Sequence, residues 1–100
     1  MSKRGEFFSK PALAEFCKRY RVRELSVFGS VTRGDDGPES DLDVLVEFES
    51  DARVGFLLLG KMSRELSGMA GRRVDLVLKA GLKPAIRDHV LREAEVVFAE

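Results

Sequence analysis

Cysteine is almost missing from this 100-residue sequence, and its scarcity excludes two classes of small protein. The single cysteine, Cys17, cannot form an intramolecular disulfide, and no zinc site can be built from several cysteines. Cys17 lies among apolar residues with helical spacing, which predicts a small core side chain rather than a nucleophile. Histidine is equally rare, and the lone His89 is interpreted as a helix-surface or interface residue without partner ligands.

Net charge is also missing, because 17 basic residues balance 17 acidic ones. Without a positive field the chain is not expected to bind nucleic acid in general, although a local basic pocket for phosphates remains compatible with this balance. No purely apolar run is longer than four residues, as at positions 56–59, so no membrane helix is expected. The first six residues carry positive charge with no apolar stretch behind them, so we expect no signal peptide and a cytoplasmic protein.

The length of 100 residues indicates one domain over residues 1–100, because a second hydrophobic core would hardly fit. Hydrophobic periodicity and turn residues predict helices and strands in alternation. The expected elements are a helix from Ser9, a strand at 25–28, a loop at 29–40, a strand at 41–48, a helix around 54–69 that is ended by Gly68 and Gly71, a strand at 74–78, a helix from Pro84 with Ile86, Val90 and Leu91 inward, and a short strand at 96–98. This order predicts an α/β (α+β) class: a small mixed sheet, helices mainly on one face and the other partly open.

Asp41 and Asp43 are the first candidate site. Two positions apart on a strand, their carboxylates point the same way, while Leu42, Val44 and Val46 bury the opposite face. Side-by-side carboxylates repel each other unless a cation lies between them. Magnesium suits such a pair, because it uses one or two carboxylates and completes its shell with water and substrate phosphate.

Asp75 is a lone acid in the apolar strand predicted at 74–78. If that strand pairs beside the strand of Asp43, a third carboxylate can share a metal and accept a proton from an attacking hydroxyl. Each acid alone also has an ordinary interpretation: Asp41 as a turn residue, the Asp-x-Asp spacing as chance, and Asp75 as an edge-strand charge.

Gly29 and Ser30 follow directly on the first predicted strand. A glycine there lets the backbone approach phosphate oxygens, and the serine adds a hydroxyl donor. A near P-loop at 55–61 is rejected, because Met62 stands where Ser or Thr is required and the segment has the periodicity of a core helix.

Residues 25–34 read LSVFGSVTRG and residues 40–46 read SDLDVLV. Together they resemble the signature of the DNA polymerase β-like nucleotidyltransferases, in which Gly-Ser is followed after ten residues by Asp-x-Asp. The short length resembles the minimal nucleotidyltransferase (MNT) branch. Val31 and Thr32 depart from the Phe-Ala or Ala-Ala frequent in the family, for which a small packing change is expected.

The resemblance implies a nucleotidyltransferase fold with Mg²⁺, as two ions, and ATP as substrate. The residues it implies as metal-binding and catalytic are Asp41, Asp43 and Asp75, and those it implies as nucleotide-binding are Gly29, Ser30, Arg33 and Ser40. It further implies an antitoxin that transfers AMP to a tyrosine hydroxyl of a HEPN-domain toxin.

Two other functions stay open at this point. The chain can silence a partner by contact alone, although the presence of all three acids argues against a decayed site. It can also modify a small molecule, although antibiotic-modifying relatives usually carry an added helical domain. Whether the protein forms homo- or hetero-oligomers is left open by the sequence.

Overall fold

The computed structural model describes residues 7–29 and 41–100 and shows helices and strands in mixed order, as the sequence predicts. The elements are α1 (Lys10–Arg19), β1 (Val22–Phe28), β2 (Leu42–Phe48), α3 (Phe56–Ala70), β3 (Val74–Leu78), the 3-10 helix η2 (Lys79–Gly81), α4 (Pro84–Glu93) and β4 (Glu95–Ala99). The predicted loop, including Ser30, Arg33 and Ser40, lies outside the described residues. None of the helices described is long and apolar enough to cross a lipid bilayer.

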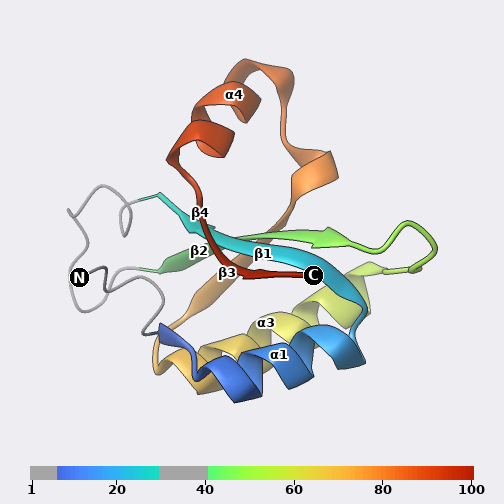
Figure 1. The fold of residues 1–100 in the computed structure, drawn as a ribbon. Helices are drawn as coiled ribbons and strands as arrows, with labels where there is room; N and C mark the ends of the chain where they lie inside the picture. The colour runs from blue at the N-terminus through green and yellow to red at the C-terminus, as the bar shows by residue number, and fades with distance from the viewer. Residues whose placement is uncertain (1–6, 30–40) are drawn as a thin grey trace.

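The sheet of the described chain has four strands in the order β3-β2-β1-β4 (Figure 1). β1 runs antiparallel to both β2 and β4, whereas β2 and β3 are parallel. A parallel pair needs a long crossover, and α3 supplies it between β2 and β3. The mixed sheet expected from the sequence is therefore confirmed.

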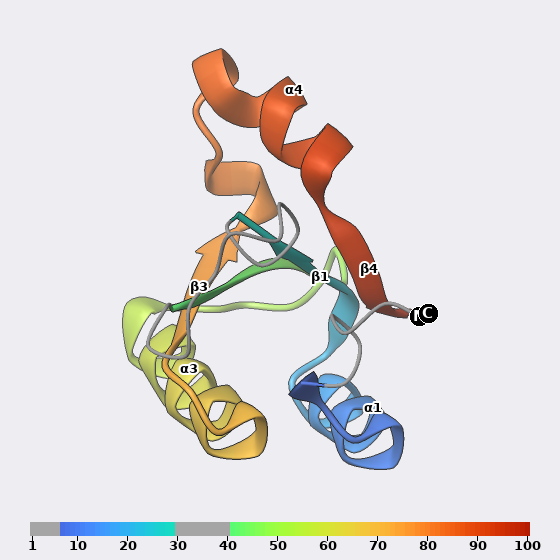
Figure 2. The same ribbon diagram turned by 90° about the vertical axis from the view of Figure 1, so that its left-hand side faces the viewer.

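The helices lie mainly on one face of this sheet. Seen along its edge, α1 and α3 lie below the sheet, and α4 lies on the opposite side (Figure 2). The larger core, between the sheet and α1 with α3, includes the fully buried Phe16, Leu25 and Met62. A smaller cluster of Leu45, Leu82 and Val90 holds α4 on the other face, which is therefore only partly covered.

The alternation predicted for β2 is confirmed. Leu42, Val44 and Val46 have no exposed surface and belong to the larger core. Leu45 belongs to the smaller cluster, and Asp43 is half-buried on the same face as Leu45. Since a shift of one residue would bury Asp43 in the larger core, the apolar residues fix which way its carboxylate points.

Three details differ from the sequence-based expectation. β1 begins at Val22 rather than at residue 25, because Arg21 turns the chain with a φ of 60° and Val22 is already in the core. Gly68 lies inside α3, which ends only at Gly71 in the left-handed conformation. Ile86, expected to point inward, is 49% exposed, because only the end of α4 around Val90 reaches the sheet.

Cys17 occupies the core position expected for it. Its side chain has no exposed surface, and burial raises the pKa of its thiol from 9.0 to about 12. We therefore predict that a thiol reagent such as Ellman's reagent modifies the unfolded chain but not the folded one. Because the folded thiol holds its proton more tightly, the free energy of unfolding should also fall as the pH rises above 9.0, as denaturant titrations would show. Rapid labelling of the folded protein would contradict this interpretation.

Candidate functional site

The site is built where β1 ends and β2 begins. In the antiparallel pair β1–β2, Phe28 lies opposite Asp43, and Gly29 follows at once. Gly29 has a φ of 83°, and a Cβ built on it would collide with Oδ2 of Asp43 and lie 3.3 Å from its Cγ. Glycine is therefore required here twice over, by the backbone conformation and by the carboxylate packed against it.

Asp43 and Asp75 form the centre of the candidate site. They are register partners in the parallel pair β2–β3, so the strand pairing on which the role of Asp75 depends is confirmed. Neighbouring strands lie about 4.8 Å apart, and partners in register project from the same face. That face also carries Leu45 and Val77, on the side of the sheet away from α1 and α3. Asp43 is half-buried and Asp75 is exposed.

Asp41 is placed less tightly than the sequence suggests. The ladder begins at Leu42, whose backbone N–H donates to the carbonyl of Arg73 at 2.8 Å, and Asp41 precedes it as an exposed residue. Within residues 7–29 and 41–100, no three acidic, histidine or cysteine side chains gather closely enough to hold a metal ion. The structure thus brings Asp43 and Asp75 together but does not join Asp41 to them as a group of three.

The chemistry of this pair suits a hard divalent cation. Two carboxylates from adjacent strands offer only oxygen atoms, and magnesium is bound in proteins by one or two carboxylates with the remaining positions left to water and phosphate. The open side of Asp75 leaves access for a substrate. Asp43 and Asp75 are therefore residues that could hold Mg²⁺, and the backbone of Gly29 lies beside them.

The 3-10 helix η2, which follows β3, lies beside the same face and is held there by ion pairs of Lys79. Nζ of Lys79 lies 3.6 Å from a carboxylate oxygen of Glu24 and 3.6 Å from one of Glu47, which are themselves register partners across β1 and β2. Nη1 of Arg87 in α4 donates to the carbonyl oxygen of Lys79 at 3.3 Å. Sequence reasoning did not single out Lys79, since its role depends on the register that places two like charges side by side.

His89 lies on the outer surface of α4, as predicted. Its side chain is 68% exposed, and its Nε2 lies 3.9 Å from a carboxylate oxygen of Glu93 one helical turn later. It contributes to neither the smaller cluster nor the carboxylate pair.

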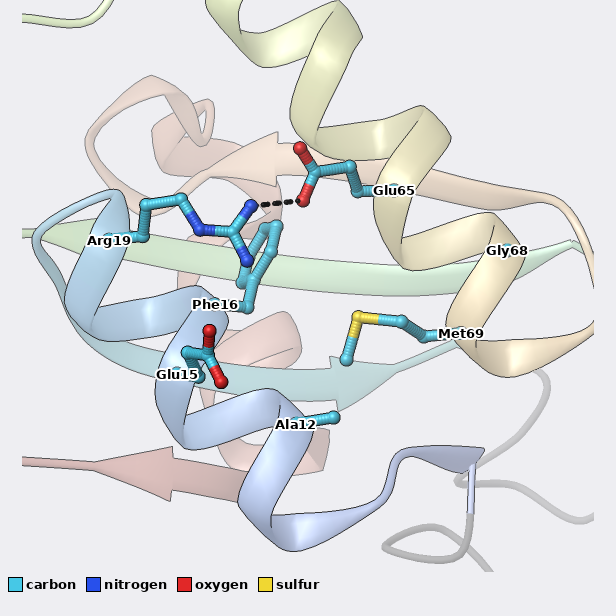
Figure 3. A pocket seen from close by; sticks show the side chains of 7 residues that line it. All are labelled: Ala12, Glu15, Phe16, Arg19, Glu65, Gly68 and Met69. Carbon is cyan, nitrogen blue, oxygen red and sulfur yellow. Dashed lines mark hydrogen bonds and ion pairs between the residues drawn. The ribbon is translucent and has the colours of Figure 1, made fainter.

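A hollow of about 390 Å³ between α1 and α3 lies on the other side of the sheet (Figure 3). Nη1 of Arg19 lies 3.0 Å from Oε2 of Glu65 across it. Glu65 also accepts a hydrogen bond from the Tyr20 hydroxyl, which raises the pKa of that phenol. These polar groups pair with one another and link the two helices. We therefore interpret the hollow as part of the packing interface between α1 and α3 and not as a binding site.

Comparison with known proteins agrees with this geometry. Residues 10–97 match the family model described as "Nucleotidyltransferase domain". The chain is 42% identical to the protein adenylyltransferase MntA of Thermococcus cleftensis over 83 residues, which is 83% of this chain and 82% of that protein.

Solved structures show the same fold. One, described as a candidate minimal nucleotidyltransferase, is 41% identical with a TM-score of 0.70, and the match covers 86% of each chain. Another contains a tri-AMPylated HEPN toxin from Shewanella oneidensis in complex with an MNT antitoxin. It matches 100% of this chain and 74% of its own with a TM-score of 0.67, and at 13% identity it supports the fold alone.

Proposed function

This chain belongs to the nucleotidyltransferase family, and from that premise we propose that it is a magnesium-dependent protein adenylyltransferase. It would transfer AMP from ATP to a hydroxyl group, a tyrosine, on a HEPN-type toxin and so act as the antitoxin. We place it in the cytoplasm, the compartment that supplies ATP.

The observation that carries this proposal is the register of Asp43 with Asp75 beside Gly29. Transfer of a nucleotidyl group needs a place for a triphosphate, negative groups to hold its cation, and an acceptor for the proton of the attacking hydroxyl. Two carboxylates on the partly open face of the sheet would supply the cation ligands and the proton acceptor, and the backbone of Gly29 beside them would leave room for the phosphates.

In this mechanism the residues hold and orient the reactants. Asp41 and Asp43 would hold one magnesium ion and Asp75 a second; when bound, the ions neutralise charge on the triphosphate. Gly29, Ser30, Arg33 and Ser40 would contact the phosphates. The acceptor oxygen attacks the α-phosphorus while Asp75 accepts its proton, and the bond to pyrophosphate breaks. No covalent intermediate on the enzyme is required, because positioning and charge neutralisation carry the step.

The acceptor is proposed by similarity. The relative from Thermococcus cleftensis is named a protein adenylyltransferase, and the solved complex from Shewanella oneidensis pairs an MNT antitoxin with an AMPylated HEPN toxin. Those names describe other proteins and support the same class of acceptor here.

The test is the intact mass of a co-purified neighbouring gene product, which we expect to be of the HEPN type, after incubation with this chain, ATP and Mg²⁺. We expect a gain of one or more adenylyl groups that is lost when a chelator removes the magnesium. A stable complex without a mass gain would contradict transfer and favour inhibition by contact. No complex at all would favour a small-molecule acceptor.

A further inference from the structure

The first turn of α3 exposes two large apolar side chains. Phe56 and Leu57 are each 93% exposed, whereas Met62 and Leu66 of the same helix have no exposed surface. The sequence predicts a core helix here, and its apolar stripe is confirmed at Leu58, Met62 and Leu66, whereas Phe56 and Leu57 lie outside that stripe. They face away from the sheet, because Leu58 of the same turn, with Met62 and Leu66, forms the stripe that packs on the larger core. Neighbouring apolar side chains left this open in a folded protein are a common mark of a partner surface.

Three basic residues lie close to them in the sequence and on α3. Arg53, Lys61 and Arg64 are exposed, and none of them forms an ion pair within the described parts of the chain. Leu57, Lys61 and Arg64 follow one another at helical spacings of four and three, so they share one stripe of α3. We call the group formed by Arg53, Phe56, Leu57, Lys61 and Arg64 the α3 patch.

A pocket adjoins the α3 patch. Its volume is about 320 Å³, and it is lined in part by the apolar side chains of Val54 and Leu58 with Arg21 and Arg53. Arg21 is already engaged, since its Nη2 lies 2.6 Å from Oδ1 of Asp51. Arg53 belongs to both the pocket and the patch. The pocket lining therefore combines apolar side chains with the basic Arg53, and Leu58 in that lining directly follows the two exposed apolar residues.

The α3 patch is remote from the carboxylate pair. α3 begins after the end of β2, while Asp43 lies at the start of that strand, so the two features are at opposite ends of the sheet (Figure 1). Seven residues of a strand span roughly 20 Å. A molecule bound at the patch would thus be held without touching the site of transfer.

We infer that the α3 patch and its pocket form a docking surface for an acidic segment of the acceptor protein that carries an apolar anchor. The inference rests on the proposed function and names where the acceptor is held. Three unpaired cations are complementary to acidic side chains, and Phe56 with Leu57 offers the apolar contact that anchors interfaces. A second copy fits less well, because a two-fold contact would press the same cations together. A membrane surface fits less well, because the rest of the apolar face of α3 is packed on the sheet.

The inference is tested by affinity measured apart from catalysis. All variants carry Asp43→Asn, and binding to the same neighbouring gene product is measured by calorimetry without ATP. The double variant Phe56→Ser, Leu57→Ser should raise the dissociation constant by roughly 30-fold or more. The double variant Arg53→Glu, Arg64→Glu should also raise the dissociation constant, and this increase should be larger at low salt than at high salt. The matched control is Val96→Thr, which removes an exposed apolar side chain elsewhere and should leave the affinity within about threefold.

Transfer measured in the otherwise wild-type enzyme separates the two proposals. With Phe56→Ser and Leu57→Ser, KM for the acceptor should rise while kcat at saturation stays unchanged. An unchanged affinity, or a fall in kcat alone, would overturn the docking surface while leaving the transferase intact. Binding that depends on the patch without any transfer would support the surface and contradict the proposed function. Patch-dependent self-association, patch-dependent binding to vesicles with anionic lipid, or no binding to the HEPN-type protein would each overturn the inference.

Discussion

Replacing Asp43 by asparagine should lower adenylyl transfer roughly a thousandfold, because the loss of a magnesium ligand removes several kcal/mol of charge stabilisation. Asparagine has the same shape as aspartate, so the packing of Gly29 against the side chain is kept. The melting temperature should therefore stay close to that of the wild type. Rates would be followed by intact mass of the acceptor under single-turnover conditions.

Asp51→Asn is the matched control for this variant. Asp51 is an exposed acid that follows the end of β2, and Arg21, with which it pairs, holds the pKa of its carboxyl below its usual value. With the acceptor at saturation, removing its charge should leave the rate of transfer within about twofold, since surface ion pairs of this kind contribute little to stability. Transfer by Asp43→Asn at a rate near that of the control would remove Asp43 from the site.

The sequence is most informative where a strand is a short apolar run between charged residues or alternates strictly. Val74–Leu78 is found as β3 with the bounds predicted, because an apolar run around one acid, bounded by Arg73 and Lys79, has few other interpretations. β2 is likewise predicted within one residue from its alternation. The class of the fold follows from the order of such elements.

The pairing of Asp43 with Asp75 could be stated only as a condition. Periodicity places each acid on a strand and on one face, but the register between strands depends on the length and path of the α3 crossover. The structure supplies that register. The contribution of Asp41 and of the loop residues Ser30, Arg33 and Ser40 stays a prediction from the sequence.

The exposure of Ile86, which was expected to point inward, has a physical cause that periodicity does not show. A helical stripe shows which side of a helix is apolar, but it does not show how far the neighbouring layer extends. Ile86 has the right spacing but lies at the beginning of α4, and only the end of that helix around Val90 reaches the sheet, so Ile86 stays exposed. How far a layer extends is decided by the tertiary structure.

Gly29→Ala is the second change with a large expected effect. Gly29 has a left-handed φ of 83°, in which an alanine costs about 1–2 kcal/mol, and the new Cβ would collide with Oδ2 of Asp43. The carboxylate must move or the end of β1 must shift, and displacing a catalytic group by about 1 Å is expected to cost roughly a hundredfold in rate. Denaturant titration and intact-mass kinetics would measure the two effects separately.

Gly71→Ala separates backbone strain from the collision. Gly71 has a similar φ of 71°, but a Cβ there would meet no atom within 4 Å. It should therefore lose about the same stability from the left-handed conformation while keeping its transfer rate. If the two variants lose transfer equally, strain alone accounts for the effect and Gly29 does not position Asp43. A loss confined to Gly29→Ala would mean that the missing Cβ at β1's end sets where the carboxylate lies.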